Sequence, residues 1–159
     1  MRYTLSILVE NQFGVLARIA GMFSGRGFNI DTLNVAPALD LKTSRLTIVF
    51  HGNHQILEQV RKQVSKLINV LSVEELSEEN SLARELLLIR IQADAVHQNA
   101  IIALCAQFDA HVMEQYATTI TIQIANTEKK IHHFLELLQP FKIVDLRRTG
   151  KVALALTTS

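Results

Sequence analysis

One stretch of the sequence, residues 8–35, decides how the chain folds, and it reads LVENQFGVLARIAGMFSGRGFNIDTLNV. An apolar strand pattern runs into Glu10, the chain turns at Gly14, and a short amphipathic helical pattern follows. A glycine within residues 25–27 ends that helix, because glycine readily takes the backbone conformation found after helix ends. A second strand pattern begins at Asn29. The stretch therefore predicts a strand, a turn, a helix and a second strand.

The same reading extends over the whole chain and predicts two α+β units of similar order. Apolar periodicity predicts strands at 3–9, 30–35, 45–50, 71–74, 86–91, 112–116, 119–124, 142–147 and 152–156, with four helices between them. Each half then has the order β-α-β-β-α-β, which is the split-βαβ arrangement. The acidic, polar segment between the halves reads as a linker. We therefore expect a first domain over residues 1–76, a linker over 77–83 and a second domain over 84–159.

Composition excludes several classes of protein. The chain has 159 residues, 48% of them hydrophobic, with 16 basic and 15 acidic side chains and a net charge of +1. A nucleic-acid binder is expected to carry a basic excess, which this balance lacks. A single cysteine fits a reducing compartment, and no apolar run approaches the ~20 residues of a membrane span. We expect a cytoplasmic protein that contacts neither membrane nor nucleic acid.

The turn within residues 8–35 has the features of a binding site. Asn11 and Gly14 stand before the helix, Asn29 follows it, and the strand-turn-helix is expected to bring them close together. The first N–H groups of a helix have no internal acceptor, and the helix dipole adds positive potential there. Gly14 has no Cβ that would keep a ligand carboxylate from those groups. The sequence predicts a site for a small anionic or zwitterionic ligand.

The second strand, from Asn29 to Val35, is expected to lie at the edge of its sheet. In a split-βαβ unit the strands lie in the spatial order 4-1-3-2, so strand two has one unpaired side. Leu33 and Val35 make this edge apolar, and no proline blocks its middle. Such an edge can pair with a second copy of itself. We expect a homodimer in which the ligand site lies near the subunit boundary.

Four motifs carry a family resemblance over nearly the whole chain. They are Glu10-Asn11-x-x-Gly14-Val15-Leu16-x-Arg18, Arg26-Gly27-Phe28-Asn29-Ile30, Val35-Ala36-Pro37 followed by Ser44-Arg45-Leu46-Thr47-Ile48, and Arg84-Glu85-Leu86. In combination they resemble the regulatory (small) subunit of acetohydroxyacid synthase, also called acetolactate synthase. The resemblance implies an N-terminal ACT domain, a ferredoxin-like C-terminal domain and dimerisation through paired ACT sheets.

The resemblance also implies a function and a set of residues. Valine, or another branched-chain amino acid, would bind at the dimer interface as an allosteric ligand. The thiamine-diphosphate chemistry would belong to a separate catalytic (large) subunit, which this chain activates and makes sensitive to feedback; the chain itself would hold no cofactor. The implied effector contacts are Asn11, Gly14, Val15, Leu16, Asn29 and Ile30, and the implied dimer edge is Leu33, Asn34 and Val35. Asn34 departs from the family pattern, in which a threonine is expected.

No other residue pattern indicates catalysis or metal binding. The six histidines show no metal-ligand spacing with cysteines or carboxylates, and Cys105 falls inside an apolar helical stripe typical of a core. Three alternatives stay open. They are an amino-acid-responsive transcriptional or translational regulator, an RNA-binding protein of the same strand order, and an enzyme of ferredoxin-like topology. RNA binding would need stacking aromatics on the third strand, which offers only Phe50.

Overall fold

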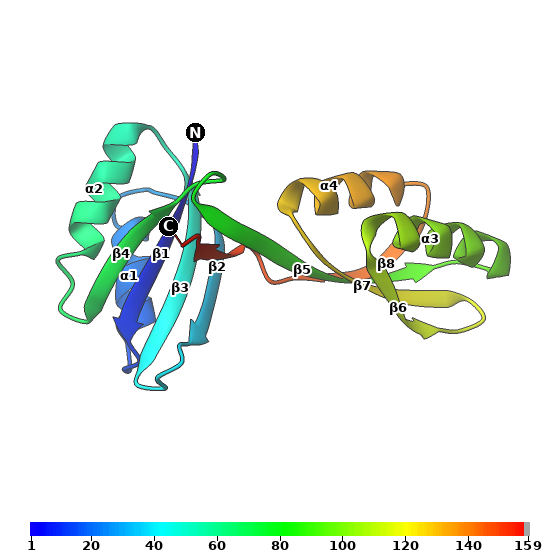
Figure 1. The fold of residues 1–159 in the computed structure, drawn as a ribbon, viewed down its shortest axis with the longest axis horizontal. Helices are drawn as coiled ribbons and strands as arrows, with labels where there is room; N and C mark the ends of the chain where they lie inside the picture. The colour runs from blue at the N-terminus through cyan, green and yellow to red at the C-terminus, as the bar shows by residue number, and fades with distance from the viewer. Residues whose placement is uncertain (158–159) are drawn as a thin grey trace. The chain divides into compact units, whose positions relative to one another are not determined.

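The computed structural model describes residues 1–157, which form two compact units (Figure 1). The first unit is Met1–Ala83 together with the residues from Lys151 onward, and the second is Arg84–Gly150. Each unit packs helices on one face of its own sheet. The predicted α+β class, with two βαββαβ units, is confirmed.

The first unit is built from the predicted alternation of strands and helices. Its elements are β1 (Arg2–Glu10), α1 (Val15–Ser24), β2 (Ile30–Pro37), β3 (Thr43–His51), α2 (His54–Val64) and β4 (Val70–Leu76). The strands lie in the order β2-β3-β1-β4, and each neighbouring pair is antiparallel. The expected order is thus confirmed, and β2 and β4 are the two edges of this path.

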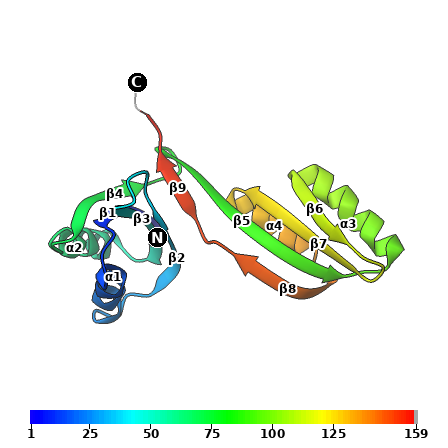
Figure 2. The same cartoon turned by 90° about the horizontal axis from the view of Figure 1, so that it is seen from below.

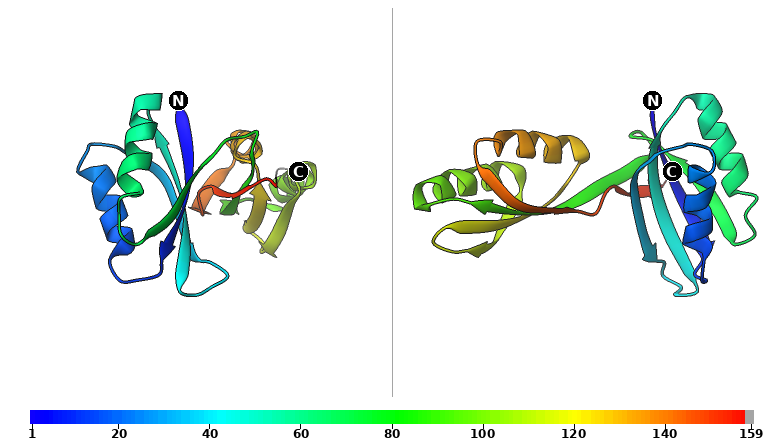
Figure 3. Two further views of the ribbon diagram at one scale, coloured as in Figure 1. Left: turned by 60° about the vertical axis from the view of Figure 1, so that its left-hand side comes forward. Right: turned by 180° about the vertical axis from the view of Figure 1, so that it is seen from behind.

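Both helices of the first unit cover the same face of the sheet (Figure 3). On β1, Leu5, Ile7 and Val9 are buried toward them, since alternate residues of a strand share one face. From α1, Val15, Ile19 and Phe23 pack down onto this surface, at the i, i+4, i+8 spacing of one helical stripe. This packing fixes where α1 begins, and so fixes the turn before it.

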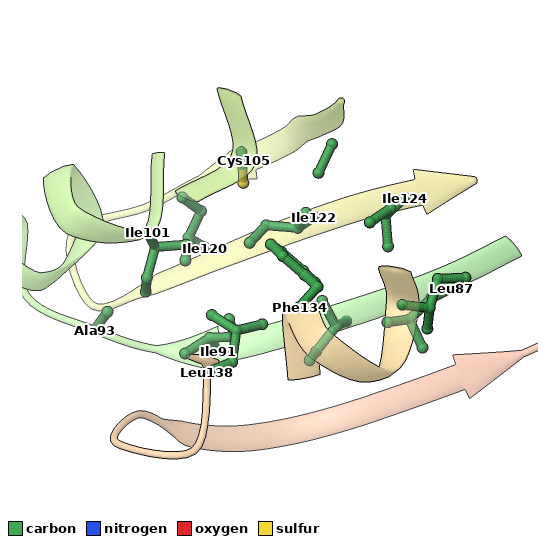
Figure 4. Packing of buried hydrophobic residues seen from close by; sticks show 13 residues of the cluster. Leu87, Ile91, Ala93, Ile101, Cys105, Ile120, Ile122, Ile124, Phe134 and Leu138 are labelled. Atoms are coloured by element: carbon green, nitrogen blue, oxygen red, sulfur yellow. The ribbon is translucent and has the colours of Figure 1, made fainter. Parts of the chain in front are cut away.

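The second unit repeats the order around its own core. Its elements are β5 (Ser81–Gln92), α3 (Ala95–Phe108), β6 (Ala110–Gln115), β7 (Thr119–Asn126), α4 (Glu128–Leu137) and β8 (Lys142–Arg148), with sheet order β6-β7-β5-β8. Isoleucines and leucines from the strands meet Phe134 and Cys105 of the helices (Figure 4). Residue types that favour helix caps begin both helices: Asp94 accepts from the His97 amide, and Thr127 accepts from the Lys130 amide.

The boundary between the units differs from the predicted one at both ends. The expected linker over 77–83 is a turn at 77–80 followed by the first residues of β5. The last strand, β9 (Val152–Ala155), was expected in the second domain but groups with the first unit, where it pairs with β5 (Figure 2). The Leu156 amide donates to the Asn80 carbonyl at 2.7 Å, and Lys151 Nζ donates to Thr4 Oγ1 at 3.4 Å. These long-range bonds cannot be deduced from local sequence pattern.

Candidate functional site

Gly14 is the residue from which α1 starts, and its backbone is left-handed, with φ of 81° and ψ of −6°. It makes no side-chain cap, so the first turn keeps its free donors. Within residues 1–157, the amides of Leu16 and Ala17 find no backbone acceptor. A Cβ added at Gly14 would meet no heavy atom within 4 Å, which means that the space beside these amides is open. The predicted helix start is present, with free backbone donors and open space beside them.

Asn11 ties this turn to the loop between β2 and β3. Its backbone N–H donates to the Lys42 carbonyl at 2.7 Å, and its side-chain Nδ2 donates to the Leu41 carbonyl at 3.0 Å. Because the amide nitrogen is used in this way, the side-chain carbonyl oxygen is the group that remains to accept a hydrogen bond. Asn11 is exposed, so a ligand can reach that oxygen. The side chain therefore suits an ammonium donor.

Asn69, which the sequence did not single out, connects a third loop to the same place. Its Nδ2 donates to Glu10 Oε2 at 2.6 Å, its Oδ1 accepts from Arg18 Nη1 at 2.9 Å, and its backbone carbonyl accepts from the Glu10 amide. One amide side chain thus joins the end of β1, the first turns of α1 and the loop before β4. An asparagine in a loop carries no sequence signal of such a role, since its partners lie 51 and 59 residues away.

Three loops therefore meet at one end of the first unit. They comprise residues 11–14, 38–42 and 65–69, and we call them the loop end. Figure 1 shows them together at the lower end of the unit as drawn there. The hydrogen bonds of Asn11 and Asn69 hold them in a fixed arrangement around the start of α1.

Val15 and Leu16, both predicted effector contacts, present different groups to the space beside the start of α1. The Val15 side chain is buried in the core, and its amide points back to the Gln12 carbonyl at 3.4 Å, a long hydrogen bond. The Leu16 side chain is exposed beside the turn. Val15 can therefore contribute only backbone to a ligand, whereas Leu16 can contribute an apolar wall.

Asn29 and Ile30, the other two predicted contacts, lie at the opposite end of the sheet. In register, Ile30 faces Phe50 of β3, and Phe50 faces Tyr3 at the start of β1. Asn11 follows the far end of that strand, about 23 Å away at 3.3 Å per residue. The expectation that one chain brings Asn11, Gly14 and Asn29 together was wrong, because β2 runs parallel to β1 and begins where β1 begins.

An ion-pair cluster fixes the start of β2. A register shift between Ile30 and Thr32 marks a bulge at Asp31. The Asp31 carboxylate lies 2.6 Å from His51 Nδ1 and 3.5 Å from Arg2 Nε. The cluster anchors the backbone next to Asn29, whose own side chain is exposed. Asn29 is thus held in place and open to a partner.

The predicted dimer edge is formed by β2, which among the described strands pairs only with β3. Leu33 is half-buried and packs against the core of the unit, while Val35 is exposed. Asn34 is half-buried and faces Thr47 across the sheet. The open side of β2 is therefore available along its length.

Metal-ligating clusters and reactive cysteines are two features that a reaction centre could use. Within residues 1–157, no three histidine, cysteine, aspartate or glutamate side chains gather as a metal site. Cys105 is buried among apolar side chains, and desolvation raises the pKa of its thiol, which disfavours the nucleophilic thiolate. No described helix has the length and apolarity needed to cross a membrane.

Comparison with known proteins matches both halves of the chain to families of acetolactate synthase small subunits. Residues 5–72 match the family described as the AHAS small subunit-like ACT domain, where AHAS is acetohydroxyacid synthase. Residues 84–157 match the family described as the small subunit of acetolactate synthase.

Individual relatives match over almost their full length. The probable acetolactate synthase small subunit of Archaeoglobus fulgidus is 41% identical over 97% of this chain and 96% of its own. The acetolactate synthase isozyme 3 small subunit of Salmonella typhimurium is 40% identical over 98% and 96%. The crystal structure of the small subunit from Thermotoga maritima superposes with a TM-score of 0.93 at 30% identity, covering 100% and 99% of the two chains. The resemblance found in the sequence motifs is confirmed, and the chain belongs to the family of acetolactate synthase small subunits.

Proposed function

We propose that this chain is the regulatory subunit of an acetolactate synthase and binds a branched-chain amino acid, valine foremost, across a homodimer of its ACT domains. Family membership supports the regulatory role. The observation that supports a site shared between two chains is the separation of the residues that the resemblance implies as effector contacts. Asn11 and Gly14 lie at one end of the sheet and Asn29 at the other. A single chain cannot close one small ligand between them.

Edge pairing of two chains would remove that separation. If β2 pairs antiparallel with β2 of a second copy, the start of one strand lies beside the end of the other. The end of β2 is also the end of the sheet where Asn11 and Gly14 lie, since Pro37 faces Ser44 and Ser44 faces Val9. Asn29 of the partner subunit would then approach the helix start of the first. Two equivalent sites would form per dimer, each with residues from both chains.

The groups assembled in this way match the parts of a free amino acid. The carboxylate would accept from the amides of Leu16 and Ala17 at the positive end of α1. The ammonium would donate to the side-chain oxygen of Asn11, with Asn29 of the partner subunit offering a second amide group. The exposed Leu16 side chain and the apolar edge of β2 would cover a branched aliphatic side chain.

The magnitudes fit a metabolite sensor. Hydrogen bonds to a charged group contribute roughly 1.5–3 kcal/mol each, and the helix end adds about 0.3–1 kcal/mol. Burying a valine-sized side chain adds ~1.5–3 kcal/mol, against an association cost of about 4–15 kcal/mol. We therefore expect a Kd in the micromolar to millimolar range. A coupling free energy of ~1–3 kcal/mol would suffice to change the activity of the catalytic subunit.

The experiment has two parts on the intact chain. Calorimetric titration with valine, leucine and isoleucine, with serine as control, tests the effector. Addition of the chain to the purified large subunit of the same organism, with and without the bound amino acid, tests activation and feedback. Saturable binding of a branched amino acid, together with stimulation that this amino acid reverses, is the expected result. A chain that neither binds nor stimulates the large subunit would refute the proposal.

A further inference from the structure

Large apolar side chains crowd the tips of all three loops of the loop end. Phe13 and Leu39 are fully exposed, Ile68 is 86% exposed and Leu41 is 74% exposed. Each loop contributes at least one of them. Single exposed apolar residues are ordinary, but exposed apolar side chains on each of three hydrogen-bonded loops of one unit favour an interface.

Apolar exposure elsewhere in the described chain has a different character. Val96 and Leu154, with comparable exposure, stand on α3 and β9. The open face of the second unit's sheet has a polar network, in which Arg90 Nη2 and Thr121 Oγ1 both donate to Glu114 Oε2. The loop end thus combines three loops that each present a strongly exposed apolar side chain.

Hydrogen bonds also hold the three loops of the loop end together before any partner arrives. Asn11 links the first loop to the second by a hydrogen bond of 3.0 Å to the Leu41 carbonyl. Asn69 of the third loop bonds to Glu10 and Arg18, which flank the first loop, at 2.6 and 2.9 Å, and its Nδ2 lies 3.4 Å from Gln12 Oε1 within it. A preordered surface loses less conformational entropy when it is buried. Apolar anchors on such a surface are the residues that carry most of the binding energy in interfaces.

From these observations we infer that the loop end is the surface that docks on the catalytic subunit, inserting Leu39, Leu41, Ile68 and Phe13 into an apolar recess. The inference rests on the proposed function, since it names where that partner binds. The rim of the loop end carries exposed Arg18, Lys42 and Lys66 against the single exposed carboxylate of Asp40. The recess should therefore have an acidic rim.

A second copy of the chain is the less suitable occupant. Pairing along β2 covers the side of the sheet, whereas the loop end lies beyond the ends of β1 and α2. The dimer would hold two such ends, one for each large subunit. Phe13 is next to Gly14, so a subunit seated here touches the loop that holds the effector. Binding of the effector at the start of α1 thereby affects the docked large subunit across only one or two residues of backbone.

The test uses Leu39→Asp and Ile68→Asp in the intact chain, since neither residue belongs to the effector site. Val96→Asp is the matched control, an apolar residue of similar exposure on another element. Binding to the purified large subunit is measured by sedimentation, effector binding by calorimetry, and self-association by light scattering. Leu39→Ser and Ile68→Ser serve as milder variants if an aspartate impairs folding.

We expect each loop variant to bind the large subunit roughly thirtyfold more weakly, as for loss of an interface anchor. Val96→Asp should bind normally, and all variants should keep effector binding and self-association. If the wild type binds and the loop variants bind equally well, the inference is overturned while the proposed function stands. If the variants lose self-association instead, the occupant is a second copy and the inference is again overturned. A wild type that does not bind the large subunit refutes the proposed function itself.

Discussion

Gly14 meets two requirements at once. Its φ of 81° lies in the left-handed region, and its missing Cβ leaves the first amides of α1 open. The first requirement concerns stability and the second concerns the ligand. Substitutions at this position can therefore separate the two.

At the residue scale, Gly14→Ala should lower the free energy of unfolding by about 1 kcal/mol, because alanine is strained at positive φ. Gly14→Asp should in addition weaken binding of the amino acid more than ~30-fold, since a carboxylate would stand where the ligand carboxylate belongs. Denaturant unfolding and calorimetric titration measure the two effects. Gly21→Asp, on the same helix with open space around it, is the charge control and should bind normally. Normal binding by Gly14→Asp would place the site elsewhere.

Substitution of Asn69 tests stability first, because we assign this residue no contact with the ligand. Asn69→Ala would leave Glu10 and Arg18 without their shared partner and should cost about 1–3 kcal/mol of unfolding free energy. Effector binding should fall as well, since the turn before α1 loses its support. Asn69→Asp, which keeps the shape but repels Glu10, should be at least as damaging. Stability equal to wild type in the alanine variant would show that the network contributes nothing.

At the scale of elements, a charge introduced on either edge strand of the first sheet should affect dimerisation differently. Val35→Lys places a charge on the open edge of β2 and should turn the dimer into monomers with weakened effector binding. Leu71→Lys does the same on β4, the other edge, where Leu71 is also exposed. This control should leave the dimer intact. Light scattering after gel filtration measures both, and monomers from Leu71→Lys alone would move the interface to β4.

The cap of α3 predicts a dependence on pH. The Asp94 carboxylate accepts from the His97 amide at 3.0 Å and lies 2.7 Å from His97 Nδ1, and the amide bond first of all lowers its pKa. A lowered pKa in the folded state stabilises the fold above the unfolded-state pKa of about 4. The benefit is lost as pH falls through the folded-state pKa. Urea unfolding of wild type and Asp94→Ala should therefore show a constant stability difference from neutral pH down to about pH 4 and converge as the pH falls further. A difference that stays constant well below pH 4 would contradict the ionised cap.

At the scale of the whole molecule, β9 returns to the first unit after the chain has built the second. A chain ending at Gly150 should lose protection from hydrogen exchange in β4 and at the start of β5, because β9 pairs there and Leu156 bonds to Asn80. The second unit should keep its protection, since its core lies within Arg84–Gly150. A chain ending at Thr157 retains these contacts and is the control. Loss of protection in α3 and α4 instead would assign the last strand to the second unit.

Local sequence pattern predicted most of the fold because most of its determinants are local. The caps at Asp94 and Thr127, the buried stripe of α1 and the strand order of the first sheet follow from spacing within one element or one unit. The role of Asn69 and the return of β9 could not be predicted, because their partners lie far away in the chain.

At the candidate site, the helix start at Gly14 could be predicted from the sequence, whereas the separation of Asn29 from it could not. The helix start at Gly14 is local and is present as expected. Asn29 is close to Gly14 in sequence, but a helix and a parallel strand direction separate the two in space. Sequence neighbourhood cannot show which end of a sheet a residue occupies until the direction of each strand is known.

The most direct test of the account is the binding of valine by mixed dimers, made by refolding Gly14→Asp and Asn29→Ala chains together. Each homodimer should fail to bind, because both of its sites carry a lesion. In the mixed dimer one shared site collects both lesions and the other is wild type. The account predicts one valine bound per mixed dimer with wild-type affinity. Mixed dimers that bind no valine would show that each site lies within a single chain, and would contradict it.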